Sequence, residues 1–326
     1  MTITDWPASE QTLAQVRRFN KRLAWLPRFR IRNRLTPRVI QLLLRAGQIG
    51  GAGKLARHGL TAETKVIAVA GASVPLRIIR PRAQSRGVVL DFHGGGWVIG
   101  NAQMNDDLNL AMVNACNVTV VSVDYRLAVS TPIQGLLADC LGAAHWLLGA
   151  EEFAGLPVIV VGESAGGHLA AATLLGLKAS PTLLQRISGA LLYYGVYDLT
   201  GTPSVRSASA DTLVLDGPGM VEALRLLTPG LDDPTRRQPP LSPLYGDFSD
   251  FPAALMLVGE LDPLKDDTLQ LADRWRQSAA VEAHLLPASP HGFIHFPTAL
   301  AQDVLAYSHR WVTARIDATL AARHGA

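Results

Sequence analysis

Residues 157–167 read PVIVVGESAGG, an apolar run that leads through a Gly-x-Ser-x-Gly pentapeptide into a helix-like stretch. Such a pentapeptide alone occurs by chance, so its position between a strand and a helix carries the argument. A tight strand-to-helix turn needs small residues beside the serine, because the helix then packs close to the strand. The turn holds the Ser164 hydroxyl out at the end of a sheet, beside a helix N-terminus that favours negative charge. Ser164 is therefore predicted to be a nucleophile; the alternative is a serine that only caps the helix.

Short apolar runs alternate with helix-like stretches on both sides of this segment. We expect strands at 74–81, 87–95, 118–126, 157–164, 190–196, 254–260 and 281–289. We expect helices at 103–116, 133–149, 166–178, 265–279 and 298–321. Several of the strands are almost continuously apolar, which is typical of strands covered by helices on both faces. The pattern predicts one α/β domain with a mostly parallel central sheet flanked by helices.

Two segments depart from this alternation. Residues 10–58 look helical, with breaks expected near Pro27, Pro37 and residues 50–53. Residues 200–242 are rich in Gly, Pro and Asp and contain no regular strand pattern. An insertion at that point is expected to lie over the carboxyl ends of the strands, where open α/β sheets bind ligands.

The composition is that of a globular protein with a large core. Of 326 residues, 48% are hydrophobic and 17% are charged, which argues against disorder. Cys116 and Cys140 lie in apolar stretches and are predicted to be buried thiols, and no zinc-type Cys/His spacing occurs. The N-terminus lacks a secretory pattern, and no run approaches the roughly 18 apolar residues of a membrane span. We expect a soluble, cytoplasmic protein without stable membrane insertion.

Positive charge is concentrated in residues 1–58, which carry twelve basic and two acidic side chains, a net charge of +10. Since the whole chain is +3, the remainder is −7. Such a segment either touches an anionic surface or is a solvated helical face that covers the core. We favour the solvated face, and we expect no nucleic-acid partner because no nucleic-acid motif accompanies the charge.

A glycine-rich loop precedes the serine in the chain, where residues 93–97 read HGGGW. Serine attack on a carbonyl builds an oxyanion, and rigid N–H donors must already face it. Consecutive glycines such as Gly94 let the backbone turn its N–H groups to one point with no Cβ in the way. The N–H of Ala165 is predicted to be a further donor. His93 is predicted to brace the loop rather than transfer protons.

A serine hydroxyl needs a general base at neutral pH, and an acid orients that base. Asp262 follows the expected strand 254–260, and His291 lies in the loop after the next strand. Both therefore fall at strand ends on the same sheet edge as Ser164, in the order Ser, Asp, His. We predict that His291 is the base and that Asp262 orients it.

Other acids and histidines compete for these roles. Asp266 and Asp267 are expected to begin the next helix, where acids are favoured, and Glu260 to lie on the strand. Glu163 adjoins the nucleophile, and we expect it to have a structural role close to the triad. The remaining candidates are His295 as an alternative base, His168 as a pocket-facing or surface residue, and His145 and His284 as ordinary packed or solvated side chains.

Taken together, the motifs resemble the hormone-sensitive-lipase-like esterases, also called the α/β-hydrolase fold-3 group, which includes bacterial acetyl esterases and arylesterases. The resemblance runs from about residue 65 to 315. Five motifs carry it, in the family's order and rough spacing: HGGGW at 93–97, DYRLA at 124–128, GESAGG at 162–167, DPL at 262–264 and HGF at 291–293.

The resemblance implies an α/β-hydrolase fold with a helical cap, built from residues 1–50 and from an insertion at about 200–242 within a catalytic domain of residues 51–326. It implies hydrolysis of small-molecule esters with short to medium acyl chains, without metal or cofactor. The oxyanion donors carry over to Gly95, Gly96 and Ala165. A homodimer is common among such esterases, although the motifs do not decide the assembly of this chain.

The sequence departs from the family pattern at three places. DYRLA is usually followed by Pro-Glu and a Phe-Pro pair, whereas residues 129–135 read VSTPIQG. Asp139 is kept in the following helix. Glu163 stands where Asp is commoner, and His168 where Asn is frequent. We expect the altered loop to change pocket shape and substrate range without removing a triad member.

Two further functions fit the same residues. Some proteins of this fold bind a ligand after losing a catalytic residue, but here all three candidates are present. Amide, lactone or carbamate hydrolysis passes through similar tetrahedral intermediates, so the triad does not separate it from ester hydrolysis.

Overall fold

A single mixed sheet runs through the computed structural model, which describes residues 3–31, 35–49 and 51–324. The strand order is β1-β9-β8-β7-β6-β4-β5-β3-β2. Among the described strands, the pairs β2–β3 and β3–β5 are antiparallel and all other pairs are parallel, so the expectation of a mostly parallel sheet is confirmed. The strands are β1 (Thr4–Asp5), β2 (Ala62–Val69), β3 (Ala72–Ile79), β4 (Val88–Phe92), β5 (Thr119–Val123), β6 (Val158–Glu163), β7 (Ile187–Tyr193), β8 (Ala254–Gly259) and β9 (Val281–Leu286).

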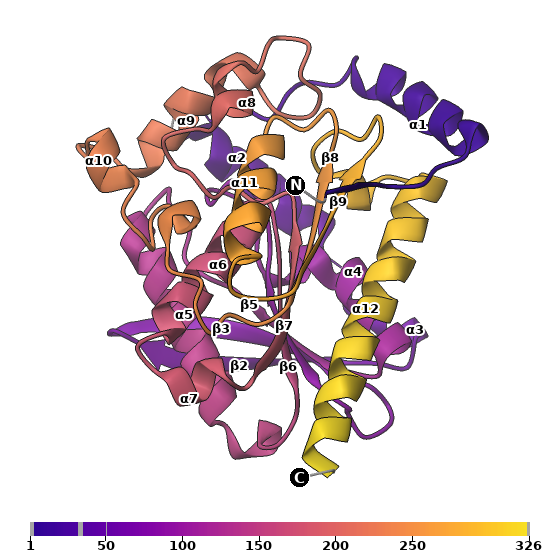
Figure 1. Cartoon of the computed structure of the whole chain (residues 1–326), viewed down its shortest axis with the longest axis vertical. Coiled ribbons are helices and arrows are strands. Elements are labelled where there is room, and N and C mark those ends of the chain that lie inside the picture. The colour runs from indigo at the N-terminus through magenta and orange to yellow at the C-terminus, as the bar shows by residue number, and fades with distance from the viewer. Residues whose placement is uncertain (1–2, 32–34, 50, 325–326) are drawn as a thin grey trace.

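Helices cover both faces of the sheet, with α5 and α6 on one side and α4 and α12 on the other (Figure 1). Successive residues of each central strand therefore enter different cores. Leu90 and Val160 pack against α5 and α6, whereas Val89 and Ile159 pack on the opposite face. The helices are α1 (Glu10–Leu23), α2 (Leu35–Gly47), α3 (Gly51–Arg57), α4 (Asp106–Cys116), α5 (Ile133–Gly149), α6 (Ala165–Leu177), α7 (Pro181–Leu184), α8 (Pro203–Arg206), α9 (Met220–Leu227), α10 (Asp233–Arg236), α11 (Lys265–Trp275) and α12 (Ala299–His324).

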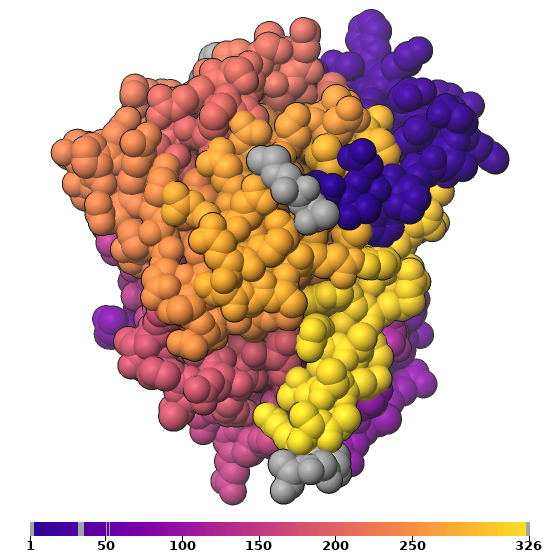
Figure 2. Space-filling view, in the orientation of Figure 1, coloured from indigo at the N-terminus to yellow at the C-terminus, as the bar shows by residue number. Residues whose placement is uncertain are grey.

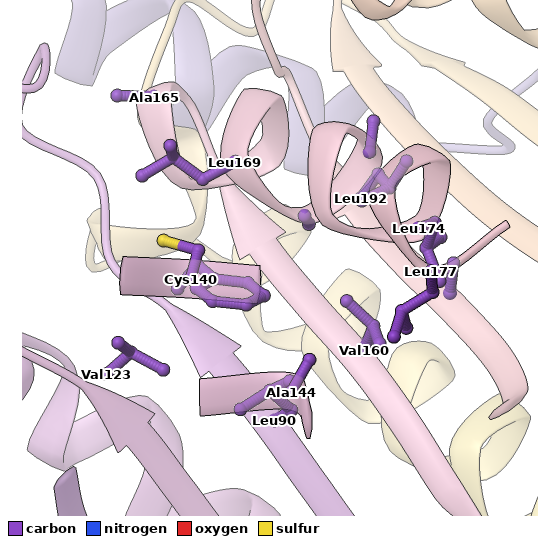
Figure 3. Packing of buried hydrophobic residues seen from close by; sticks show 14 of the residues in the cluster. Leu90, Val123, Cys140, Ala144, Val160, Ala165, Leu169, Leu174, Leu177 and Leu192 are labelled. Atoms are coloured by element: carbon purple, nitrogen blue, oxygen red, sulfur yellow. The ribbon is translucent and has the colours of Figure 1, made fainter. Parts of the chain in front are cut away.

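The core beneath α6 is closely packed, and it fixes the start of that helix. Figure 3 shows Leu90, Val160 and Leu192 of three adjacent strands facing Leu169 and Leu174 of α6. All five side chains are fully buried. Cys140 lies in the same cluster, and both cysteines are buried free thiols as expected. Since the apolar contacts hold α6 against the sheet, its first turn has a defined position relative to the strand ends.

The expected elements agree with the structure along the alternating part of the chain, and α5 agrees at both ends. Three details were wrong. Pro37 does not break a helix but lies in the first turn of α2, where a proline sacrifices no hydrogen bond. The edge strands β1 and β2 were not expected, because β1 has two residues and most of β2 is exposed. Glu260 lies just past the end of β8 rather than on it.

Helices α1 and α2 and residues 200–242 lie at one end of the molecule, above the carboxyl ends of the strands, whereas α3 lies at the side, near α12 (Figures 1 and 2). Residues 200–242 fold into short helices, α8, α9 and α10, joined by loops. They meet the N-terminal segment through Phe29, whose N–H donates to the Val214 carbonyl and whose carbonyl accepts from the Asp216 N–H. Arg32 and Arg34 of the basic segment lie outside the described residues.

Candidate active site

Ser164 occupies the turn between β6 and α6 and has a left-handed backbone, with φ of 54°. This conformation is unfavourable for a residue with a Cβ, so the surrounding packing must impose it. A Cβ on Gly162 would lie 2.3 Å from the Gly166 carbonyl oxygen, and one on Gly166 would lie 1.9 Å from that of Phe92. Glycine is therefore required at both positions, which explains the pentapeptide.

A chain of two hydrogen bonds joins Ser164 to the two other predicted residues. The Ser164 hydroxyl lies 2.9 Å from Nε2 of His291, and Nδ1 of His291 lies 2.8 Å from an oxygen of Asp262. His291 and Asp262 are buried. The second Asp262 oxygen accepts from the Leu264 N–H at 2.9 Å. Three residues far apart in the chain thus meet in the geometry of a nucleophile, a base and an orienting acid.

The neighbouring acids are used elsewhere. Asp266 accepts from the Ser204 N–H at 2.9 Å and so ties α11 to α8. Asp267 accepts from the N–H groups of Tyr197 and Asp198, and burial raises its pKa to about 7 despite these hydrogen bonds. Both lie in the first turn of α11, as expected. Glu260 accepts from the Ala288 N–H. Within the described part of the chain, His291 is hydrogen-bonded to Asp262 and Ser164 and to none of these three acids.

Glu163 and His295 form a second pair beside this chain. A buried Glu163 oxygen accepts from the Tyr194 hydroxyl at 2.8 Å and from Nε2 of His295 at 2.7 Å. Burial alone would raise the pKa of Glu163, but the charge and hydrogen bond of His295 lower it to about 2. Burial would lower the pKa of His295, but Glu163 raises it. His295 is therefore committed to Glu163 rather than to Ser164.

The glycine loop faces Ser164 with free backbone donors. Gly95 and Gly96 have φ of 106° and 57°, in the region that favours glycine. A Cβ on Gly95 would lie 2.2 Å from the Ile99 carbonyl oxygen. Neither Gly95 nor Gly96 donates its N–H to an acceptor within the described residues. Ala165 is the first residue of α6, where N–H groups lack an intrahelical acceptor.

His93 and Tyr125 support this loop from behind. The two rings stack with centroids 4.1 Å apart, and the Tyr125 hydroxyl donates to the His93 carbonyl at 2.7 Å. Nδ1 of His93 lies 2.7 Å from the Gly94 carbonyl and donates to it. Burial lowers the pKa of His93 to about 4, so its ring is neutral near pH 7. The His93 side chain, at the start of the glycine loop, is thus hydrogen-bonded to the loop's own backbone at Gly94.

The residues just before the altered segment 129–135 are hydrogen-bonded to the glycine loop and to α5. Ala128 donates its N–H to the Trp97 carbonyl at 2.8 Å. Asp139, fully buried on α5, accepts from the N–H of Arg126 at 3.0 Å and from its guanidinium at 2.8 Å. The attachment therefore comes from Arg126 and Ala128 of the DYRLA motif rather than from the altered residues.

His168 is neither on the surface nor in the pocket, so that expectation was wrong. It is fully buried and lines neither cavity at Ser164. Its Nδ1 accepts from the Trp97 indole N–H at 3.1 Å, and its Nε2 donates to the Leu241 carbonyl at 2.8 Å. The adjacent residues of α6 are all buried as well. They are small or apolar in the sequence, and this composition is the signal that the sequence analysis missed.

Two hollows meet at Ser164. One has a volume of about 70 Å³ and is mainly apolar, lined by residues that include Phe29, Leu215, Met220 and Leu224. The other, of about 340 Å³, is lined by the glycine loop, His291 and His295. Sequence reasoning did not single out Phe29, which lines both hollows. No group of metal-ligating side chains occurs within residues 3–31, 35–49 and 51–324.

Residues 89–295 match the protein family that is described as having the alpha/beta hydrolase fold. The chain belongs to this family. It is a carboxylesterase of the serine-hydrolase type, within the hormone-sensitive-lipase-like group, as the motifs predicted. Among the described elements, no helix combines the length and apolarity needed to cross a bilayer.

Relatives and solved structures of the α/β-hydrolase family agree with this assignment. Carboxylesterase NlhH of Mycobacterium tuberculosis is 33% identical over 235 residues, which cover 68% of this chain and 72% of that protein. An arylesterase of Saccharolobus solfataricus is 31% identical over 214 residues, covering 63% and 67%. The crystal structure of esterase LipW from Mycobacterium marinum superposes with a TM-score of 0.81 at 26% identity, covering 94% of this chain and 97% of LipW.

Proposed function

We propose that Ser164, His291 and Asp262 are the catalytic triad of this carboxylesterase. The carrying observation is the hydrogen-bonded chain from the Ser164 hydroxyl through His291 to Asp262. Nε2 of His291 accepts the serine proton, and Nδ1 donates to Asp262, which sets the tautomer and stabilises the imidazolium. The alternative that Ser164 only caps α6 is disfavoured because its side chain makes no capping hydrogen bond.

The proposed reaction has two halves. Ser164 attacks the ester carbonyl while His291 takes its proton, and His291 then protonates the departing alcohol. Water deprotonated by His291 attacks the acyl-enzyme, releases the acid and restores the serine. Each half passes through a tetrahedral intermediate whose oxygen carries negative charge.

We assign the oxyanion donors to the backbone N–H groups of Gly95, Gly96 and Ala165. The support is their freedom from acceptors and the left-handed glycine backbone that faces Ser164. His93 and Gly94 act as supports, since they bond to each other and to Tyr125. Removal of one such donor typically costs about 3 kcal/mol of transition-state stabilisation.

Residues 1–50 and 200–242 are proposed to form the cap over this site. Phe29 and Leu215 form an isolated parallel β-bridge and together line the apolar hollow. Arg30 also forms an ion pair with Asp216 at 2.7 Å. The two parts of the chain are thus joined directly above Ser164, which makes the cap the element that shapes the substrate pocket.

The small hollow beside Ser164 supports a proposal for the substrate class. A volume of about 70 Å³ beside Ser164 fits an acyl chain of a few carbons. Relatives named ethyl acetate hydrolase in Pseudomonas putida, 30% identical, and acetyl esterase in Salmonella typhi, 26% identical, support small acyl groups. We therefore propose esters with short to medium acyl chains as substrates, hydrolysed without metal or cofactor.

The test is hydrolysis of p-nitrophenyl esters from acetate to palmitate by the wild type and by Ser164→Ala. We expect turnover that peaks at short chains and is absent in the variant. Ser130→Ala, which alters an exposed loop serine, is the matched control and should retain full turnover. Turnover by folded Ser164→Ala at the wild-type rate would reject the assignment. No turnover by wild type on any ester would favour an amide or lactone substrate or a ligand-binding role.

A further inference from the structure

Helix α2 is oriented opposite to the usual arrangement of a surface helix. Surface helices normally turn their apolar stripe toward the core. Here Val39, Leu42 and Leu43 are 58%, 69% and 66% exposed, and Ile49, two residues past the helix, is 85% exposed. Residues 39, 42 and 43 are spaced so that they share one face of the helix, and Ile49 lies in the turn that follows it. We call these four side chains the α2 patch.

Two polar side chains on the opposite face fix this orientation. The Gln41 amide donates to the Gly100 carbonyl at 2.8 Å and accepts from the Gly100 N–H at 2.7 Å. Gln48 and Asn101 exchange a second pair of amide hydrogen bonds, at 2.8 and 2.7 Å. Since four hydrogen bonds attach the polar face to residues 100–101, α2 cannot rotate its apolar face inward without breaking them.

The chain just before α2 extends the exposed apolar surface. Trp25 is 90% and Leu26 is 57% exposed. Leu26 lines a groove of about 630 Å³ together with Thr36 and Ile40, so it lies beside the first turns of α2. Tryptophan is favoured where water meets lipid, because its ring is apolar and its N–H is polar. Several large apolar side chains exposed in one region of the chain indicate an interaction site.

Basic residues accompany the apolar side chains. Arg38 and Arg45 lie seven positions apart on α2, both are exposed, and neither forms an ion pair within the described residues. Further exposed basic side chains on α1 are Arg18, Lys21 and Arg22. Exposed leucines and a tryptophan beside arginine and lysine are the composition of helices that lie in a lipid interface.

We propose that the α2 patch docks this carboxylesterase onto an anionic lipid surface. The charge distribution decides among the occupants. Pairing of two copies through α2 would bring the exposed Arg38 and Arg45 of one copy close to those of the other, and these like charges repel each other. An anionic bilayer instead attracts these charges and receives the leucines at the depth of its headgroups.

Docking at this place brings the lipid close to the catalytic site. Residues 100–101, which hold α2, follow directly after the glycine loop. Phe29 lines both the groove beside α2 and the hollows at Ser164. The groove beside α2 therefore adjoins the hollows at Ser164 through Phe29, which brings an ester from the bilayer near the proposed nucleophile.

The test is flotation of the full chain with vesicles of phosphatidylglycerol and phosphatidylcholine, compared with vesicles of phosphatidylcholine alone. We expect binding to the anionic vesicles only, and weaker binding as salt rises, because surface charges are screened over about 8 Å at physiological ionic strength. Leu42→Gln/Leu43→Gln should weaken binding about tenfold or more. Arg38→Gln/Arg45→Gln should weaken it about fivefold for each charge removed.

The control variant Val66→Gln removes an exposed apolar side chain of β2, outside both the patch and the proposed cap, and should bind like the wild type. Each variant should retain wild-type hydrolysis of p-nitrophenyl acetate without lipid, so this readout separates docking from the proposed function. Equal binding to both vesicle types, absence of binding, or an unchanged Leu42→Gln/Leu43→Gln variant would overturn the proposal. Self-association of the wild type that this variant abolishes would also overturn it, in favour of a second copy.

Discussion

The carboxylate of Glu163 accepts a hydrogen bond from Nε2 of His295 at 2.7 Å. Glu163 directly precedes Ser164 in the chain, and His295 follows His291 by four residues. The pair removes from competition the histidine that could have replaced His291 as base. It also gives the site a defined dependence on pH, since each partner changes the pKa of the other.

The first prediction concerns stability against pH. The pKa of Glu163 falls from 4.5 to about 2 on folding, so its contribution exists above pH 4.5 and is lost as the pH falls toward 2. The pKa of His295 rises from 6.5, so its contribution exists below pH 6.5 and is lost as the pH rises past the folded value. The pair should therefore stabilise most between pH 4.5 and 6.5.

Glu163→Gln should lower the free energy of unfolding in that window by about 2 kcal/mol, the size of a hydrogen bond to a charged group. It should also flatten the fall of Tm on acidification. Thermal unfolding followed by circular dichroism from about pH 3 to about pH 8 measures both effects. An unchanged acid limb in the variant would show that Glu163 does not titrate as described.

The second prediction separates Asp262 from its neighbour in the next helix. Asp262→Asn should lower kcat by roughly a thousandfold or more, because an amide favours the wrong His291 tautomer. Asp266→Asn is the matched control, and it should leave kcat nearly unchanged because Asp266 bonds to Ser204 instead. Steady-state kinetics on p-nitrophenyl acetate decide, and the reverse order of effects would move the acid to Asp266.

A third prediction tests the turn that presents Ser164. Gly166→Ala should destabilise the protein by about 3 kcal/mol or more, because the new Cβ would lie 1.9 Å from the Phe92 carbonyl oxygen. Gly149→Ala, at the end of α5, meets no heavy atom within 4 Å and should change stability by less than about 1 kcal/mol. Urea unfolding measures both, and equal stability of the two variants would contradict the close packing of β6 and α6.

The fourth prediction concerns the support of the glycine loop. Asp139→Ala should cost about 1–2 kcal/mol, because it leaves the Arg126 N–H without its buried acceptor, whereas the partly exposed guanidinium can turn to water. The variant should also lower kcat by a larger factor than it changes KM. The reason is that Ala128, two residues after Arg126, is hydrogen-bonded to Trp97 at the end of the glycine loop. Asp233→Ala, which removes a surface partner of Arg236, is the comparison and should leave kcat unchanged. Loss of stability without loss of kcat would restrict Asp139 to a structural role.

Local patterns in the sequence determined the alternating core and the family. Helix periodicity among neighbouring residues set the ends of α5. Small side chains beside Ser164 determined its turn, and acids at a helix start marked the first turn of α11. The order of the five motifs predicted the α/β-hydrolase family, and the family match confirmed it. The roles of Ser164, Asp262 and His291 stay predictions, although the structure brings the three together.

Tertiary structure alone decided the features that depend on partners distant in the chain. The periodicity of α2 defines an apolar stripe but not its direction, and it points outward because Gln41 and Gln48 bond to a loop more than fifty residues away. His168 could have faced solvent on a lone helix, but α6 lies between the sheet and its neighbours. Phe29 became part of the pocket only by pairing with Leu215. In each case the orientation of the side chain is stabilised by contacts with residues distant in the chain, which the residues of one segment do not specify.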